Sequence, residues 1–240
     1  MKNISKIKKI VKSLELSPND TVFEIGPGHG ELTKELRLGI KDLKKVQIIA
    51  IEKDKKLADD LRLKINDLGL TNIQIINGDA LQKLPPLIVK LPNYRMTNYK
   101  IVGNIPYYIT GRLLRILGDL KKKPKTIVLT VQKEVAERIT AKPPQMNLLA
   151  ASVQFWAKPE IIDFISKNDF EPAPEVDSAV IKLATDNPKE GHKTETKNYY
   201  KLIRALFKQP RKTILNNITA DSKLAKATTQ ETKPRPSSGA

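Results

Sequence analysis

"TVFEIGPGHGELTKELRLG", residues 21–39, combines a short apolar strand, a glycine-rich turn and an amphipathic helix. Gly26, Gly28 and Gly30 lie between the strand and the helix, where the chain turns sharply and where backbone can approach a ligand. The following helix offers free N–H groups to an anion. The spacing is G-x-G-x-G, which differs from the G-x-G-x-x-G of dinucleotide-binding proteins. This strand, turn and helix therefore predict an α/β fold of the nucleotide-binding type, but they do not identify the ligand by themselves.

Strands and helices alternate over the residues that follow. Hydrophobic spacing predicts further strands at 46–52, 73–79, 99–105 and 126–132. It predicts helices at 4–16, 53–69, 110–120, 133–140 and 147–157. Residues 82–98, rich in Pro, Asn and Tyr, are expected to form a loop. The strands are apolar on both faces, which is typical of a parallel sheet covered by helices.

Two strand-like runs then follow one another without a helix, at 160–166 and 178–184. They predict an antiparallel pair at the sheet edge, and hence a seven-stranded, doubly wound, Rossmann-like domain over residues 1–184. The polar residues 185–197 are expected to be a linker. They open a small, basic, helical C-terminal domain, 185–240, whose tail from residue 219 is predicted to be disordered.

Composition limits the classes of function. Lys and Arg total 43 against 26 acids, a net charge of +17, which favours a nucleic-acid partner. The alternative is a soluble protein from a lysine-rich proteome. The chain has no Cys and only two His, His29 and His192, so we expect no disulfide and no metal site. No apolar run reaches membrane-span length, and the N-terminus lacks a secretory signal. We expect a cytoplasmic monomer.

Acidic side chains follow two of the predicted strands. Glu52 ends the second strand, where a carboxylate can accept both hydroxyls of a ribose. Asp79, followed by Ala80, ends the third strand and can accept the exocyclic N–H of an adenine. With the glycine loop, this arrangement describes S-adenosylmethionine better than NAD. Glu24, inside the first strand, is expected to hold the loop or to meet the methionine amino group.

The fourth strand ends in "IVGNIPYYIT", residues 101–110. The Asn104 amide and the Ile105 carbonyl offer two acceptors to one NH₂ group, and Pro106 fixes the turn. Tyr107 is expected to stack on the base that carries this group. The pattern indicates methyl transfer to an exocyclic amine, helped by positioning and by acceptors where positive charge develops. The alternative is a simple turn.

Seven stretches in order resemble the ribosomal RNA adenine dimethyltransferase family, most of all its small-subunit housekeeping members. They are "VFEIGPGHGELT", "AIEKD", "NGDAL", "IVGNIPYYIT", "LTVQKEVAERITAKP", "FEPAPEVDSAVIKL" and "FKQPRKTILNNI", and they cover most of residues 4–218. The resemblance implies that S-adenosylmethionine is bound by Gly26, Glu52, Asp79 and Asn104. It implies N6,N6-dimethylation of two adjacent adenines near the 3′ end of small-subunit (16S) rRNA, within an immature subunit.

The resemblance also implies a second aromatic near the target base, Phe170. Pro172 and Pro174 stiffen this loop, so a stacking wall is reasonable; the alternative is a hydrophobic lid. Tyr108 is expected to pack rather than to take part in the chemistry.

Basic side chains near the C-terminal end are candidates for RNA contact. Lys208, Arg211 and Lys212 are expected to contact RNA phosphates, the alternative being a solvated helix face.

The sequence departs from the family pattern at both ends. Family members usually carry an N-terminal segment ending in Gln-Asn-Phe-Leu, and this sequence begins just after it; the C-terminus also stops early. Weaker cofactor affinity and weaker RNA docking are the expected consequences. Two other functions stay open: a large-subunit (23S) rRNA methyltransferase conferring macrolide resistance, and a non-catalytic RNA-binding ribosome-assembly factor.

Overall fold

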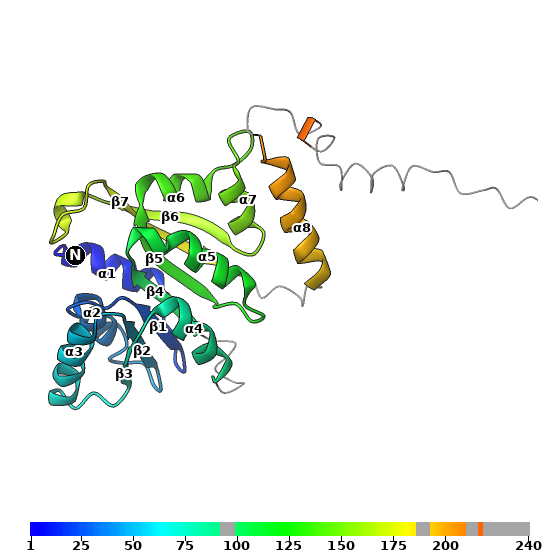
Figure 1. Ribbon diagram of the computed structural model, residues 1–240. Coiled ribbons are helices and arrows are strands. Elements are labelled where there is room, and N and C mark those ends of the chain that lie inside the picture. The colour runs from blue at the N-terminus through cyan, green and yellow to red at the C-terminus, as the bar shows by residue number, and fades with distance from the viewer. Residues whose placement is uncertain (92–98, 186–192, 210–215, 218–240) are drawn as a thin grey trace, which may run out of the picture.

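Seven strands form one mixed sheet in the order β3-β2-β1-β4-β5-β7-β6 (Figure 1). The computed structural model describes residues 1–91, 99–185, 193–209 and 216–217. The strands are β1 Thr21–Ile25, β2 Gln47–Glu52, β3 Ile73–Asn77, β4 Tyr99–Asn104, β5 Thr126–Gln132, β6 Lys158–Ile165 and β7 Ser178–Ala184. Strands β1 to β5 pair in parallel, whereas β7 runs antiparallel to both β5 and β6. The predicted seven-stranded α/β fold with an antiparallel edge pair is confirmed.

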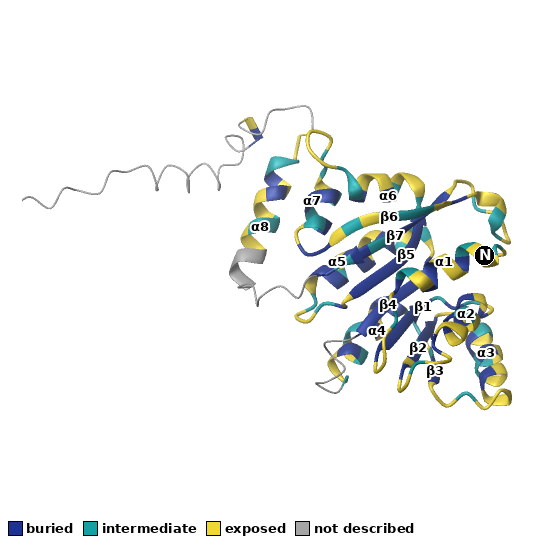
Figure 2. Ribbon diagram, turned by 180° about the vertical axis from the view of Figure 1, so that it is seen from behind, coloured by how far each residue is buried: buried dark blue, intermediate teal, exposed yellow. Residues whose placement is uncertain are grey.

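Helices cover both faces of the sheet (Figure 1). They are α1 Ile4–Ser13, α2 Glu31–Gly39, α3 Lys55–Asp67, α4 Ala80–Val89, α5 Thr110–Asp119, α6 Lys133–Thr140, α7 Leu148–Gln154 and α8 Lys193–Leu206. Helices α1 to α3 share one buried apolar cluster with the sheet, and α4 to α7 share the other. Successive strand residues alternate between these clusters, as Val22 and Phe23 do. Figure 2 shows the resulting buried central strands.

Four helices begin at a side chain that caps their first turn. Asn3, Asp54, Asp79 and Asn147 each accept a hydrogen bond from a backbone N–H two or three residues further on, at 2.9–3.3 Å. Such a cap satisfies a donor that the helix itself leaves unpaired, and it contributes about 1 kcal/mol. Two of these caps, Asp54 and Asp79, each lie two residues beyond the end of a strand, β2 and β3, so they also fix where each strand turns into its helix.

The prediction of a loop over residues 82–98 was wrong for its first part, because helix α4 occupies residues 80–89 and contains Pro85 and Pro86. Proline removes helical hydrogen bonds, so the composition argued against a helix. Burial outweighs this cost: Leu81, Leu84 and Ile88 all pack into the core. Residues 92–98 lie outside the described residues.

Several helix boundaries also differ from prediction: the helices predicted at 53–69 and 147–157 are observed at 55–67 and 148–154. The first helix ends at Ser13, three residues early, because Glu15 adopts a left-handed backbone with φ 52°. The expected linker over 185–197 is shorter, since α8 begins at Lys193. The ring of Tyr199 in α8 stacks on Phe155 after α7, with centroids 3.9 Å apart. The division into two domains at residue 184 stays a prediction, and the predicted disordered tail lies outside the described residues.

Within the described part of the chain, no helix is long and apolar enough to cross a membrane. The same residues contain no group of three or more His, Cys, Asp or Glu side chains that could hold a metal ion.

A buried ion pair joins the amino ends of the central strands. Lys100 Nζ in β4 lies 2.7 Å from the carboxylate of Asp20, and the two side chains are 1% and 2% exposed. Lys100 also donates to the carbonyl of Glu15, and the Asp20 carboxylate accepts the N–H of Ser17 at 2.7 Å. The pair therefore ties β4 to the turn between α1 and β1. A buried charge is tolerated here because both partners have further hydrogen bonds.

We expect Lys100→Met to lower the free energy of unfolding by about 3–5 kcal/mol, because it leaves the Asp20 carboxylate buried without a cation. Urea unfolding followed by circular dichroism measures this loss. The exposed Lys121→Met serves as the matched control, and the double variant Lys100→Met with Asp20→Asn should recover part of the loss. Equal stabilities of Lys100→Met and the control would contradict the assignment.

Candidate active site

The glycine loop leaves the carboxyl end of β1 in a left-handed backbone. Gly26, Gly28 and Gly30 have φ of 65°, 57° and 92°. The N–H of Gly26 donates to the carbonyl of Ile51 at 3.0 Å, which ties the start of the loop to β2. A Cβ on Gly28 would meet no heavy atom within 4 Å, so the loop borders open space. These positions favour glycine for backbone reasons, and they leave the loop open to a ligand.

Glu52 ends β2 and faces the same loop. Its Oε2 accepts the N–H of Gly28 at 3.0 Å, and its Oε1 accepts the N–H of Asp54 at 2.9 Å. The side chain is 8% exposed. Each carboxylate oxygen has a second lone pair, so two further donors such as neighbouring hydroxyls can bind to a carboxylate that is already held in place.

Asp79 lies two residues beyond Asn77, the last residue of β3, and caps α4. Its Oδ1 accepts the N–H of Leu81 at 2.9 Å, which leaves the other carboxylate oxygen for a ligand donor. Ala80, the first residue of α4, is buried beside it. The cap therefore holds the carboxylate at the strand tip, as the sequence predicted.

Two cavities meet at the carboxyl ends of the central strands, and Gly26 and Asn104 line both of them. The first, of about 370 Å³, is lined by Glu52, Asp79 and Ala80. The second, of about 380 Å³, lies between the glycine loop and the start of α1. Asn104 thus lies between the cavity that contains Glu52 and Asp79 and the cavity beside the glycine loop.

The predicted acceptor residues at the tip of β4 differ in how far they are exposed to solvent. Asn104 is half-buried between the two cavities, Ile105 is buried, and Pro106 is exposed with φ −58°. The hydroxyl of Tyr107 lies 2.7 Å from Oγ of Ser178, the first residue of β7. Ser178 is fully buried, so this hydrogen bond holds the Tyr107 ring from the side of the antiparallel strands. Ser178 was not predicted, because no local sequence pattern marks a serine that starts a strand.

The expectation that Tyr108 only packs was wrong. The side chain is 78% exposed and borders the cavity that contains Glu52 and Asp79. Arg112, the third residue of α5, borders the same cavity and was not predicted. Both lie just beyond Pro106, where the chain turns from β4 into η1 (Tyr107–Ile109) and α5.

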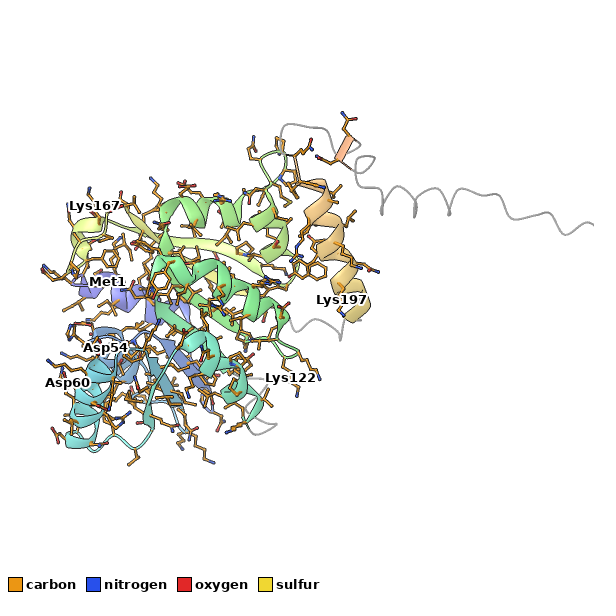
Figure 3. All side chains as sticks on the ribbon, viewed as in Figure 1. Met1, Asp54, Asp60, Lys122, Lys167 and Lys197 are labelled. Atoms are coloured by element: carbon orange, nitrogen blue, oxygen red, sulfur yellow. The ribbon has the colours of Figure 1, made fainter. Side chains whose placement is uncertain are left out.

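Phe170 lies at the end of η2 (Lys167–Asp169) and packs, partly buried, against the core cluster of α1 to α3. It does not line either cavity, whereas its neighbour Glu171 lines the second. The N-terminus holds this loop: the N–H of Lys2 donates to the Asp169 carbonyl at 2.7 Å. Figure 3 shows Met1 on the same side of the molecule as the turn at Lys167. The predicted role of Phe170 as a stacking wall stays a prediction.

Glu24 is fully buried in β1 and does not line either cavity. Its Oε2 accepts the hydroxyl of Thr33 in α2 at 2.7 Å, so it holds the helix that follows the glycine loop. Its Oε1 has no hydrogen-bond partner among the residues that the structure describes. Burial raises the pKa of this carboxyl group to about 8. Of the two predicted roles, the structure favours support of the loop.

Of the three predicted RNA-contacting residues, Lys208 is exposed just after α8, and Arg211 and Lys212 lie outside the described residues.

The family described as "Ribosomal RNA adenine dimethylase" matches residues 1–234. The chain belongs to this family. It is 40% identical over 211 residues to "Ribosomal RNA small subunit methyltransferase A" of Dehalococcoides mccartyi strain CBDB1, covering 88% of this chain and 68% of that protein. The protein of the same name from Moorella thermoacetica is 36% identical over 218 residues, covering 88% and 73%.

Two solved structures share the fold of this dimethylase family member. A dimethyladenosine transferase from Plasmodium falciparum has a TM-score of 0.76 at 26% identity, over 98% of this chain and 83% of that one. The 23S rRNA methyltransferase ErmE has a TM-score of 0.73 at 25% identity, over 95% and 86%. The resemblance and the methyltransferase fold inferred from the sequence are confirmed.

Because of Glu24, the free energy of unfolding of this dimethylase is expected to depend on pH. The unfolded chain ionises near the ordinary pKa of 4.5, while the folded chain keeps the proton up to a pH of about 8. The unfolded state therefore binds fewer protons between these values, and stability falls as pH rises. Relative to Glu24→Gln, we expect wild type to lose up to about 1.4 kcal/mol per pH unit in this window. Urea unfolding of both proteins at pH 5, 6, 7 and 8 measures it; a constant difference would contradict the pKa.

Ser178 is expected to position Tyr107. Ser178→Ala and Tyr107→Phe each remove the same hydrogen bond, worth about 1 kcal/mol, so each should lower kcat for methyl transfer by about five- to tenfold. The double variant should lose no more than either single one, because the shared bond is already gone. Cofactor affinity should not change in any of the three. Additive losses would show that Ser178 acts through something other than Tyr107.

Proposed function

We propose that this protein transfers methyl groups from S-adenosylmethionine to N6 of two adjacent adenines near the 3′ end of small-subunit rRNA. The observation that carries the proposal is the position of Asn104 between the two cavities at the tip of β4. The site residues named below are part of this proposal.

The residues around the first cavity fit the adenosine part of the cofactor. The Glu52 carboxylate is held by two backbone N–H groups and has lone pairs left for ribose hydroxyls. The free oxygen of Asp79 suits an adenine amino group. Open space beside Gly28 suits the close approach of a ligand to backbone. Bound S-adenosylmethionine would supply a methyl group on a positively charged sulfur.

The second ligand, the target adenine, would bind at the tip of β4. The Asn104 amide oxygen and the Ile105 carbonyl would accept the two N–H bonds of its amino group, and Tyr107 would hold the base by stacking. These acceptors favour the positive charge that develops on the nitrogen, so no strong general base is needed. Phe170 is proposed as the opposite wall of this base site.

The choice of small-subunit rRNA rests on sequence identity. The relatives named small subunit methyltransferase A are 36–40% identical to this chain, whereas the 23S rRNA methyltransferase ErmE is 25% identical. The two classes share the fold, so the fold does not discriminate between them. The proposed substrate is an immature small ribosomal subunit, which places the reaction in the cytoplasm.

We expect Asn104→Ala to lower kcat for methyl transfer at least about 100-fold, because it removes an acceptor at the reacting nitrogen. RNA binding should stay within twofold of wild type. The measurement is incorporation of labelled methyl groups from S-adenosylmethionine into small subunits that lack the two dimethyladenosines. Asn66→Ala, on the exposed face of α3, is the matched control. Near-normal turnover of Asn104→Ala would mean that the motif is only a turn.

The same assay separates the alternative functions. Primer extension on rRNA from each subunit locates the modified adenines, and modification of the large subunit alone would refute the small-subunit proposal. Wild type that binds small subunits but incorporates no methyl groups would instead point to a non-catalytic assembly factor.

A further inference from the structure

A cavity larger than the two at the strand tips lies away from the glycine loop, between α5, α7 and α8. Its volume is about 570 Å³, and it shares no residue with the two cavities at the strand tips. Leu114, Leu149, Val153 and Trp156 form an apolar floor. A cavity of this size is within the range of about 300–1,000 Å³ that small ligands occupy.

Positive charge surrounds this apolar floor. Five basic side chains line the cavity against one acidic side chain, Asp119. The basic side chains are Arg115, Arg138, Lys197, Lys201 and Arg204. Among the residues whose side chains the structure describes, a set without residues 186–196, only Arg138 of these cations has a carboxylate within 4 Å. That pair is the exposed contact with Glu134 at 3.9 Å.

Helix α8 contributes three of these cations on one stripe. Lys197, Lys201 and Arg204 are spaced i, i+4 and i+7, so they lie on the same helix face. Figure 3 shows Lys197 near the first turns of this helix. Like charges four residues apart destabilise a helix by a few tenths of a kcal/mol. A fold that keeps them side by side above an apolar floor is suited to an anion that also has an apolar part.

Aromatic rings add a further requirement for the occupant. Tyr200 lies on the same stripe of α8, half-buried, and its hydroxyl lies 3.4 Å from the carbonyl of Ser152 in α7. Trp156, 8% exposed, lies in the floor close to Tyr200: a Cβ on Gly118 would lie 2.9 Å from its indole nitrogen and 3.3 Å from the Tyr200 hydroxyl. Rings and apolar side chains below a rim of cations are the combination with which proteins bind single-stranded nucleic acid.

Helix α5 connects this cavity to the proposed active site. Arg112 borders the cavity that contains Glu52, while Gly111, Arg115 and Asp119 border the basic one. The stretch from Gly111 to Asp119 is about 12 Å long at 1.5 Å per residue. One RNA strand can therefore contact both sites along a single helix.

We propose that the cavity between α5, α7 and α8 binds an unpaired segment of the substrate RNA, with bases on the Trp156 and Tyr200 side and phosphates at Lys201 and Arg204. This inference rests on the proposed RNA substrate, and it assigns to that substrate a second binding site apart from the reacting adenine.

The test compares two double variants of the full chain that remove the same charge. Lys201→Gln with Arg204→Gln alters the cavity, and Lys56→Gln with Lys64→Gln alters the exposed side of α3. The probe is a fluorescent eight-nucleotide oligouridylate, and anisotropy gives its affinity from 50 to 300 mM salt. We expect the cavity variant to bind about tenfold more weakly, with a salt slope lower by about 1.4, or 0.7 for each lost phosphate contact. The α3 variant should stay within twofold of wild type.

Two further measurements locate the contact. Oligonucleotides containing 4-thiouridine should crosslink to peptides from α7 or α8 in wild type. On small subunits, the cavity variant should show a KM about tenfold higher with kcat unchanged. The assignment would be overturned if both double variants lost the same affinity for the oligonucleotide. It would also be overturned if the crosslinks lay only outside α7 and α8, or if the cavity bound an acidic protein and no RNA. Absence of methyl transfer by wild type, with the RNA results as expected, would instead refute the proposed catalytic function.

Discussion

Gly103 has no side chain, and the geometry of the candidate active site depends on this. A Cβ at this position would lie 2.7 Å from the carbonyl oxygen of Ile25, closer than such atoms approach. Only glycine lets the end of β4 run so close to the end of β1. The residue that follows β1 is Gly26, which turns away with φ 65°, and the last residue of β4 is Asn104. Asn104 therefore borders the two cavities beside the glycine loop.

This contact lies at the point where the chain order of the sheet reverses. From β1 the chain proceeds outward to β2 and β3, and from β4 it proceeds the other way to β5. The helices after the first strands cover one face, and those after β3, β4 and β5 cover the other. The crevice between β1 and β4 is left uncovered for this reason, which is where open α/β sheets bind ligands. Glu52, Asp79 and Asn104 reach it from three different strands.

The sequence predicted the parts of this arrangement that depend on short-range pattern. Apolar runs located all seven strands, and the strand tips identified Glu52, Asp79 and Asn104 because parallel strands end at one edge. Helix α4 was missed because core burial of Leu84 and Ile88 outweighs the two prolines. The hydrogen bond between Tyr107 and Ser178 joins residues 71 positions apart, so local pattern contains no signal for it. The cavity between α5, α7 and α8 requires three helices to pack, and periodicity does not specify their contacts.

The distribution of charge explains how one strongly basic chain can bind both a cofactor and RNA. The proposed cofactor cavity places the carboxylates of Glu52 and Asp79 at the strand tips, which favours hydroxyl and amino donors and disfavours phosphates. The cavity beside α8 has the opposite character, with five cations and one acid. A polyanion that approaches this chain is attracted to the second region, whereas the two carboxylates of the first lie beside Lys53 and Arg112 and leave it without net charge. Because α5 borders both, RNA bound at the basic cavity would present a neighbouring base to Asn104 without bringing its phosphates onto the two carboxylates.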